Sequence, residues 1–182
     1  MQEADKKQIT PVELAAAMMQ LTMKSIENSW ETLKPAVLAY LSTPVLTMAK
    51  EDELVRDIYV AALALEIYCI PHAFEEATAR LVSQGMGKVM ASENLVEHRL
   101  SESIANDYLP RLEAIAQRQP ADLALELVQE ATTILYERID LPLKPVDPAT
   151  SLLWAKLFPF LAGIVGKWPV LAVRFEVMTN ND

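Results

Sequence analysis

One short stretch of the sequence contains residue types that could support catalysis. Glu66, Cys69 and His72 are spaced three residues apart, and on an uninterrupted helix this spacing aligns side chains along one face. A cysteine beside a protonated histidine would be an activated nucleophile, with the carboxylate orienting the ring. Pro71 is expected to interrupt this helix, because proline lacks the backbone donor and clashes with the preceding turn. We therefore expect Cys69 to be a packing residue, and the three residues remain the catalytic candidates.

Other signatures of chemistry are missing from the sequence. The chain has two histidines, and neither His72 nor His98 follows a glutamate by three residues, as in helical di-iron sites. Glycine-rich phosphate loops and Gly-x-Ser-x-Gly nucleophile turns are also absent. The sequence predicts no metal and no cofactor, and it favours a protein that is not an enzyme over an enzyme without deciding between them.

Carboxylates recur along one face of the helix that is predicted to begin after Pro120. With Thr133 included, the row has spacings of four, four, three, four and three, which keep its members on one side of a helix. The five carboxylates are Asp122, Glu126, Glu130, Glu137 and Asp140. Such a face could bind a partner protein with a basic surface, at rates sensitive to salt. The alternative is a solvated face that keeps the protein soluble.

An apolar segment covers residues 152–173. It matches the ~20 residues needed to cross a bilayer, but Lys156 and Lys167 leave ten uncharged residues between them, and two prolines interrupt the helix. Four aromatic residues are candidates for self-association: Trp154, Phe158, Phe160 and Trp168. We expect a core or dimer contact here, and membrane contact is the alternative.

These residues must be positioned by helices. The sequence is rich in Ala and Leu and has only four glycines, a composition that favours helices joined by proline-marked turns. Thr10 and Glu13 predict a capping box, and Leu14, Met18, Leu21 and Ser25 are expected to share one face of the helix that follows.

The most apolar helix is predicted at the centre of the fold. From Ile58 to Ile70 its only charged residue is Glu66, and a helix that is apolar nearly all round is normally packed on several sides. Gly85 and Gly87 are expected to mark a turn after the next helix.

Together these patterns predict an all-α fold, a single compact domain of about seven or eight helical segments. Residues 1–9 are expected to be a disordered tail and residues 10–182 the helical domain. The proline-rich stretch 141–148 is a candidate linker before an apolar pair of C-terminal helices.

The formal net charge is −9, and residues 51–100 and 101–150 each carry nine acidic and four basic side chains. This balance disfavours direct binding to nucleic acids. A lone cysteine and a polar N-terminus without an apolar leader predict a cytoplasmic protein.

The sequence predicts a non-enzymatic helical interaction module, such as an adaptor, regulator, inhibitor or dedicated chaperone, that also forms homo-oligomers. It would use the acidic face and the apolar C-terminal segment. The alternatives are an enzyme or binder of apolar small molecules with a pocket near Glu66 and Cys69, and a peripheral membrane protein that uses residues 152–173.

Overall fold

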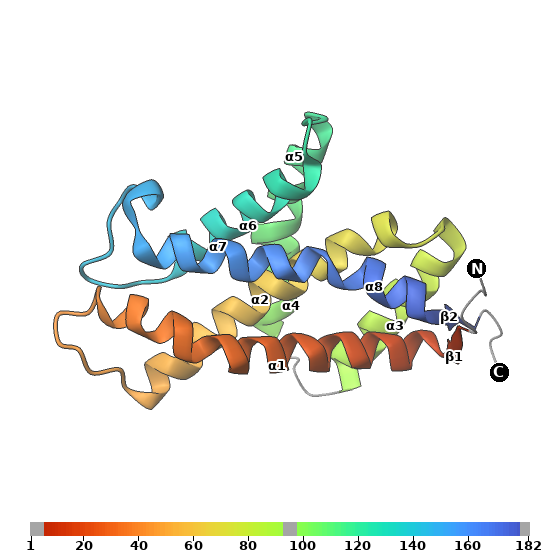
Figure 1. The fold of residues 1–182 in the computed structure, drawn as a ribbon, viewed down its shortest axis with the longest axis horizontal. Coiled ribbons are helices and arrows are strands. Elements are labelled where there is room, and N and C mark those ends of the chain that lie inside the picture. The colour runs from red at the N-terminus through yellow and green to blue at the C-terminus, as the bar shows by residue number, and fades with distance from the viewer. Residues whose placement is uncertain (1–5, 93–97, 179–182) are drawn as a thin grey trace.

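The computed structural model describes residues 6–92 and 98–178 and shows an elongated bundle of helices (Figure 1). The helices are α1 (Pro11–Leu38), α2 (Met48–Ala73), α3 (Glu76–Ser92), α4 (His98–Ser103), α5 (Leu109–Gln117), α6 (Leu123–Arg138), α7 (Leu152–Val165) and α8 (Lys167–Arg174). A π-helical turn (Ile104–Tyr108) joins α4 to α5, and a 3-10 turn (Pro148–Thr150) precedes α7. The predicted all-α fold is confirmed.

The predicted central position of α2 is also confirmed. Every residue from Ile58 to Glu66 is buried, so this part of α2 is enclosed on all sides. Helices α1, α3, α6, α7 and α8 pack around it. Burying apolar side chains on every face of one helix is the main source of stability available to a bundle of this size.

The start of α1 follows its sequence signals. The Thr10 hydroxyl accepts a hydrogen bond from the Glu13 amide at 3.2 Å, and the Glu13 carboxylate accepts from the Thr10 amide at 2.9 Å. Of the four residues expected on one face of α1, Leu14 and Met18 are buried and Leu21 is exposed. Thr22 continues the buried row that Leu14 and Met18 begin.

Two predicted breaks are wrong. Pro71 lies in the last turn of α2, where its missing donor deprives only the carbonyl of Ile67, so the helix continues to Ala73. Helix α3 also runs through Gly85 and Gly87. A Cβ atom at Gly85 would lie 2.5 Å from the carbonyl oxygen of Pro11, so this glycine lets α1 and α3 approach each other closely.

The disordered tail predicted over residues 1–9 does not extend to Lys7–Ile9, which form strand β1. This strand pairs in parallel with β2 (Phe175–Val177), in a register that places Lys7 opposite Phe175 and Ile9 opposite Val177. Ile9 packs against the core, so the pairing is held by apolar contact as well as by backbone bonds. Residues 1–5 lie outside the described part of the chain.

The candidate linker, residues 141–148, connects α6 to the turn before α7 and is tied to the bundle. Leu141 is buried, and the amide of Leu143 donates to the carbonyl oxygen of Tyr40 at 3.0 Å. The hydroxyl of Tyr136 donates to the carbonyl oxygen of Pro145 at 2.6 Å. These contacts fix the position of α7 relative to α6.

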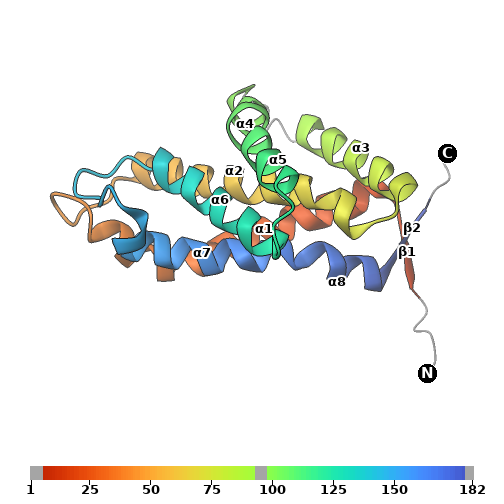
Figure 2. The same ribbon diagram turned by 90° about the horizontal axis from the view of Figure 1, so that it is seen from above.

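Helices α7 and α8 run end to end along one side of the molecule, with α4 on the opposite side (Figure 2). Their inner face is a regular row of buried residues: Leu153, Leu157, Leu161, Ile164, Trp168 and Leu171. Trp154, Phe158, Phe160 and Val165 beside this row are partly buried against the core.

Candidate functional site

The most unusual polar residue in the core is Glu66, which is 1% exposed in the middle of α2. Its side-chain oxygen Oε1 accepts a hydrogen bond from the hydroxyl of Thr22 on α1. The ammonium of Lys167, at the start of α8, donates in turn to the Thr22 hydroxyl oxygen at 3.2 Å. Thr22 therefore connects a buried carboxyl to a half-buried lysine.

Helix α8 makes a second contact with the same residue. The indole Nε1 of Trp168 donates to the backbone carbonyl oxygen of Glu66 at 2.8 Å, and Trp168 is fully buried. The other carboxyl oxygen, Oε2 of Glu66, is buried and has no hydrogen-bond partner among the described residues. The cluster of Thr22, Glu66, Lys167 and Trp168 thus joins α1, α2 and α8 and leaves one polar atom unsatisfied.

Burial dominates the titration of this cluster. Desolvation raises the pKa of Glu66 to about 7, although the Thr22 hydrogen bond and the charge of Lys167 act in the opposite direction. Desolvation also lowers the pKa of Lys167, and the charge of Glu66 opposes that shift. A carboxyl group in this position changes its charge near neutral pH instead of near pH 4 to 5.

The catalytic candidates Glu66, Cys69 and His72 do not form a nucleophilic site. Burial, with a smaller contribution from the charge of Glu66, raises the pKa of Cys69 to about 11, so the thiol stays protonated at neutral pH. His72 is exposed and its ring contacts that of Tyr68, with centroids 5.8 Å apart. The Glu66 carboxyl accepts a hydrogen bond from Thr22 and does not orient the His72 ring. These features are the reverse of what an activated cysteine requires.

A second polar cluster lies where α2, α6 and the π-helical turn meet. The guanidinium of Arg138 binds the Asp107 carboxylate and lies 3.9 Å from that of Asp57, whose pKa is raised by burial. The hydroxyl of Ser103 donates to Asp107 at 3.1 Å. A cavity of about 290 Å³ opens beside Asp57, Ser103 and Arg138, and the buried hydroxyl of Tyr108 has no partner among the residues described.

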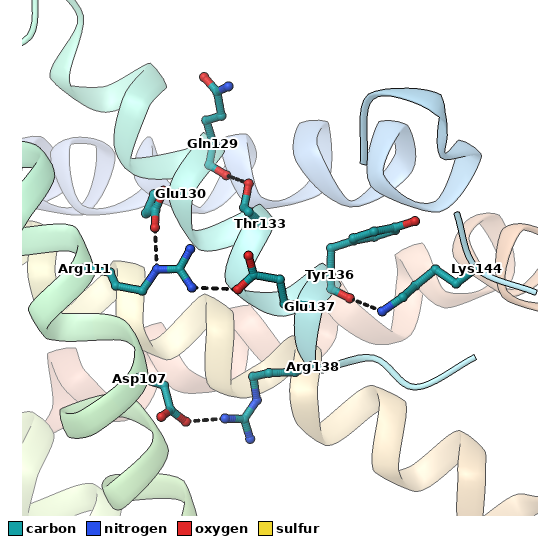
Figure 3. Close-up of polar contacts among 9 residues, drawn as sticks. All are labelled: Asp107, Arg111, Gln129, Glu130, Thr133, Tyr136, Glu137, Arg138 and Lys144. Atoms are coloured by element: carbon teal, nitrogen blue, oxygen red, sulfur yellow. Dashed lines mark hydrogen bonds and ion pairs between the residues drawn. The ribbon is translucent and has the colours of Figure 1, made fainter. Parts of the chain in front are cut away.

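The predicted acidic face on α6 is partly neutralised by an arginine of α5. Arg111 donates to Glu130 at 2.5 Å and to Glu137 at 2.7 Å, and it lies between the two carboxylates in Figure 3. Asp122 caps α6 by accepting from the amide of Leu125 at 3.0 Å. Glu126 and Asp140, the two remaining carboxylates, are exposed.

The four aromatic candidates for self-association divide into two groups. Trp168 belongs to the core and is not available to a partner, because it binds Glu66 and its ring packs edge-on against that of Phe74. Trp154 and Phe158 stack on each other with centroids 5.2 Å apart, and both, like Phe160, are half-buried.

The surface that α7 and α8 present to solvent is formed by other residues. We call it the outer face, and it consists of the exposed neutral residues Leu152, Ala155, Pro159, Ala162, Gly163, Gly166, Pro169, Val170 and Val173.

The described residues hold no cluster of metal ligands, and the two cavities described here lie away from Glu66 and Cys69. No group of three His, Cys, Asp or Glu side chains there lies close enough together to hold a metal ion. A groove of about 630 Å³ runs between the end of α2 and α3, beside Pro71, Ala79 and Ser83. Neither this groove nor the cavity beside Arg138 is lined by Glu66 or Cys69.

Comparison of the chain with models of protein families, with curated proteins and with solved structures finds no match.

The sequence interpretation found Glu66 but missed its partners. Thr22 follows Leu14 and Met18 at intervals of four, so the row of buried residues on α1 could have revealed it. The inward position of Lys167 had no local signal. Arg111 also had none, because it lies on a different helix from the carboxylates that it binds.

Proposed function

We propose that this chain is a non-enzymatic helical module that binds another protein through the outer face of α7 and α8. The observation that carries the proposal is the apolar surface that the bundle leaves uncovered. The stretch Leu152–Arg174 is long and apolar enough, by length and composition, to cross a membrane, yet only 28% of its most apolar part is buried. Large exposed apolar patches mark interaction sites in folded proteins.

The outer face has almost no charge. Between Lys156 and Arg174 it has no exposed charged side chain, because Lys167 turns inward to Thr22. Its largest residues are well exposed: Leu152 at 50%, Val170 at 51% and Val173 at 72%. Water in contact with these side chains would be released when a partner covers them, which favours binding.

The shape of the outer face favours a protein surface over a bilayer. Helices that lie on membranes insert large apolar side chains, often Trp and Phe, whereas here the aromatic rings are half-buried or buried in the bundle. Ala155, Ala162, Gly163 and Gly166 instead give a flat surface that another helix can approach closely. The net charge of −9 also opposes contact with anionic lipids.

The partner that this face fits first is a second copy of the chain. Every copy carries the same apolar face, so two copies related by a twofold axis can cover each other's surface. The homo-oligomer proposed here uses residues of the outer face as its contact. Trp168, which the sequence suggested for that contact, lies in the core. In the monomer the outer face would stay open to a helix of a different protein.

The acidic face of α6 is a weaker part of the same proposal. Glu126 and Asp140 are exposed carboxylates on it that neither bind Arg111 nor cap the helix, and they would attract a partner with a basic surface. Reversing both charges should slow binding of such a partner at low salt more than at high salt. A cytoplasmic location is also part of this proposal.

Analytical ultracentrifugation over a wide range of protein concentrations tests the proposal. We expect the wild-type protein to self-associate, and a variant with both Val170→Lys and Val173→Lys to remain monomeric. The matched control replaces Val45 and Val146, two exposed valines outside the outer face, with lysine and should associate like the wild type. A wild-type protein that stays monomeric up to millimolar concentration would overturn the self-association. If the wild type, but not the α8 variant, floats with neutral lipid vesicles, the partner is a membrane and not a protein.

A further inference from the structure

We propose that Thr22, Glu66 and Lys167 form a protonation-dependent latch that holds α8 on the bundle and so controls the outer face. The consequence for binding rests on the proposed function, because α8 contributes Val170 and Val173 to that face. The latch itself rests on the buried contacts among α1, α2 and α8.

The polar contacts of α8 with α1 and α2 come from its first two residues. Lys167 reaches the carboxyl of Glu66 through the Thr22 hydroxyl, and Trp168 binds the carbonyl oxygen of Glu66 directly. Leu171 is the next residue of α8 that is buried, one turn later. Any change at Glu66 therefore acts on the point where α8 enters the bundle.

The groups that face the Glu66 carboxyl can be named helix by helix. Helix α1 contributes the Thr22 hydroxyl, and α8 contributes the Lys167 ammonium together with the indole of Trp168. On α2 itself the nearby titratable group is the thiol of Cys69, which stays protonated at neutral pH. Lys167 is thus the charged side chain that acts on Glu66 in the described part of the chain.

The two protonation states of Glu66 suit this site unequally. Buried surroundings keep the carboxyl neutral up to about pH 7. Once ionised, Oε1 still accepts from Thr22, but Oε2 is buried without a donor. A charged oxygen enclosed without a hydrogen bond is costly, and the cost is relieved when water reaches it.

Helix α8 is the element whose movement would let water reach the Glu66 carboxylate. It has eight residues, whereas α1 has 28 and α2 has 26, so it has far fewer contacts to lose. It begins after Gly166, and glycine restricts the backbone of the junction with α7 less than any other residue does. We therefore expect α8 to be seated on the bundle below pH 7 and to loosen above it.

The indole signals of the three tryptophans in ¹H–¹⁵N NMR spectra test the latch at a protein concentration where the chain is monomeric. The signal of Trp168, assigned with the variant Trp168→Phe, should shift or broaden between pH 5.5 and 8.5 with a midpoint near 7. In Glu66→Gln this transition should be lost, whereas the control Asp52→Asn, an exposed carboxylate of α2, should keep it.

Two further variants test the direction in which the pH midpoint of the Trp168 signal moves. They remain informative if Glu66→Gln does not fold. Thr22→Val and Lys167→Met each remove a group that favours the ionised carboxyl, so both should move the midpoint to higher pH. A Trp168 signal that is unchanged over the whole range, or a midpoint that neither variant moves, overturns the latch. Because this signal is measured on the monomer, it can fail or succeed independently of self-association.

Discussion

Helix α2 and the pair α7–α8 are the two most apolar parts of the chain, and the bundle treats them in opposite ways. From Ile58 to Glu66 every residue of α2 is buried, including a carboxyl group. Along α7 and α8 only the inner row that includes Leu157, Leu161 and Trp168 is buried. Yet the lysine that should have made this segment polar, Lys167, turns inward.

The difference shows that apolar composition predicts burial but does not say what covers the surface. For α2 the chain supplies the cover itself, from α1, α3, α6, α7 and α8. For α7 and α8 it supplies cover on one side only. The uncovered side is the reason to infer a partner, since a folded chain has no other means of removing that surface from water.

The largest expected difference between the two regions is in the cost of truncating a leucine. Leu65→Ala on α2 should lower the free energy of unfolding by roughly 2–5 kcal/mol, because it opens a cavity in a closed core. Leu152→Ala on the outer face should change it by no more than about 0.5 kcal/mol. Urea denaturation of the two variants measures both values, and equal losses would show that α7 is as enclosed as α2.

A second test concerns Glu66, the carboxyl group that is buried in α2. Its pKa lies near 4.5 when the chain is unfolded and at about 7 in the bundle, so between pH 4.5 and 7 the folded state binds a proton that the unfolded state has lost. Stability from this group is therefore complete below about pH 4.5 and is lost as the pH rises to 7, by about 3 kcal/mol in total. Between pH 5 and 8 the unfolding free energy of the wild type should fall by this contribution. That of Glu66→Gln should lack this fall, because glutamine does not titrate. A parallel pH dependence in the two proteins would contradict it.

The smallest expected effect compares a covered glycine with an open one. Gly85→Ala should destabilise the protein by about 1–3 kcal/mol, because the new methyl group meets the Pro11 carbonyl of α1. Gly163→Ala lies in a helix with nothing within 4 Å of the added carbon, so it should stabilise the monomer by up to about 1 kcal/mol. Thermal unfolding of both variants measures the sign, and a loss at Gly163 would mean that the outer face is already covered.

Much of the fold follows from local patterns. Thr10 and Glu13 cap α1 as their spacing predicts, and the uninterrupted apolar run in α2 places that helix at the centre. Pro71 and Gly85 misled the prediction, because the effect of each depends on its place in the fold. A proline in a final turn breaks little, and a glycine within a helix can serve a helix crossing as well as a turn.

The sequence by itself determined the helical class of the fold and which helices would be the most apolar. It marked Glu66 as the lone charged residue of a central helix and residues 152–173 as an apolar segment of the core or of a dimer contact. Only the tertiary structure decided that Thr22 and Lys167 would meet Glu66, that Arg111 would bind two carboxylates of the acidic face, and that Trp168 would lie in the core. The physical reason is that helical periodicity is a local property of the chain, whereas these contacts join residues 19 to 145 positions apart and depend on how whole helices pack.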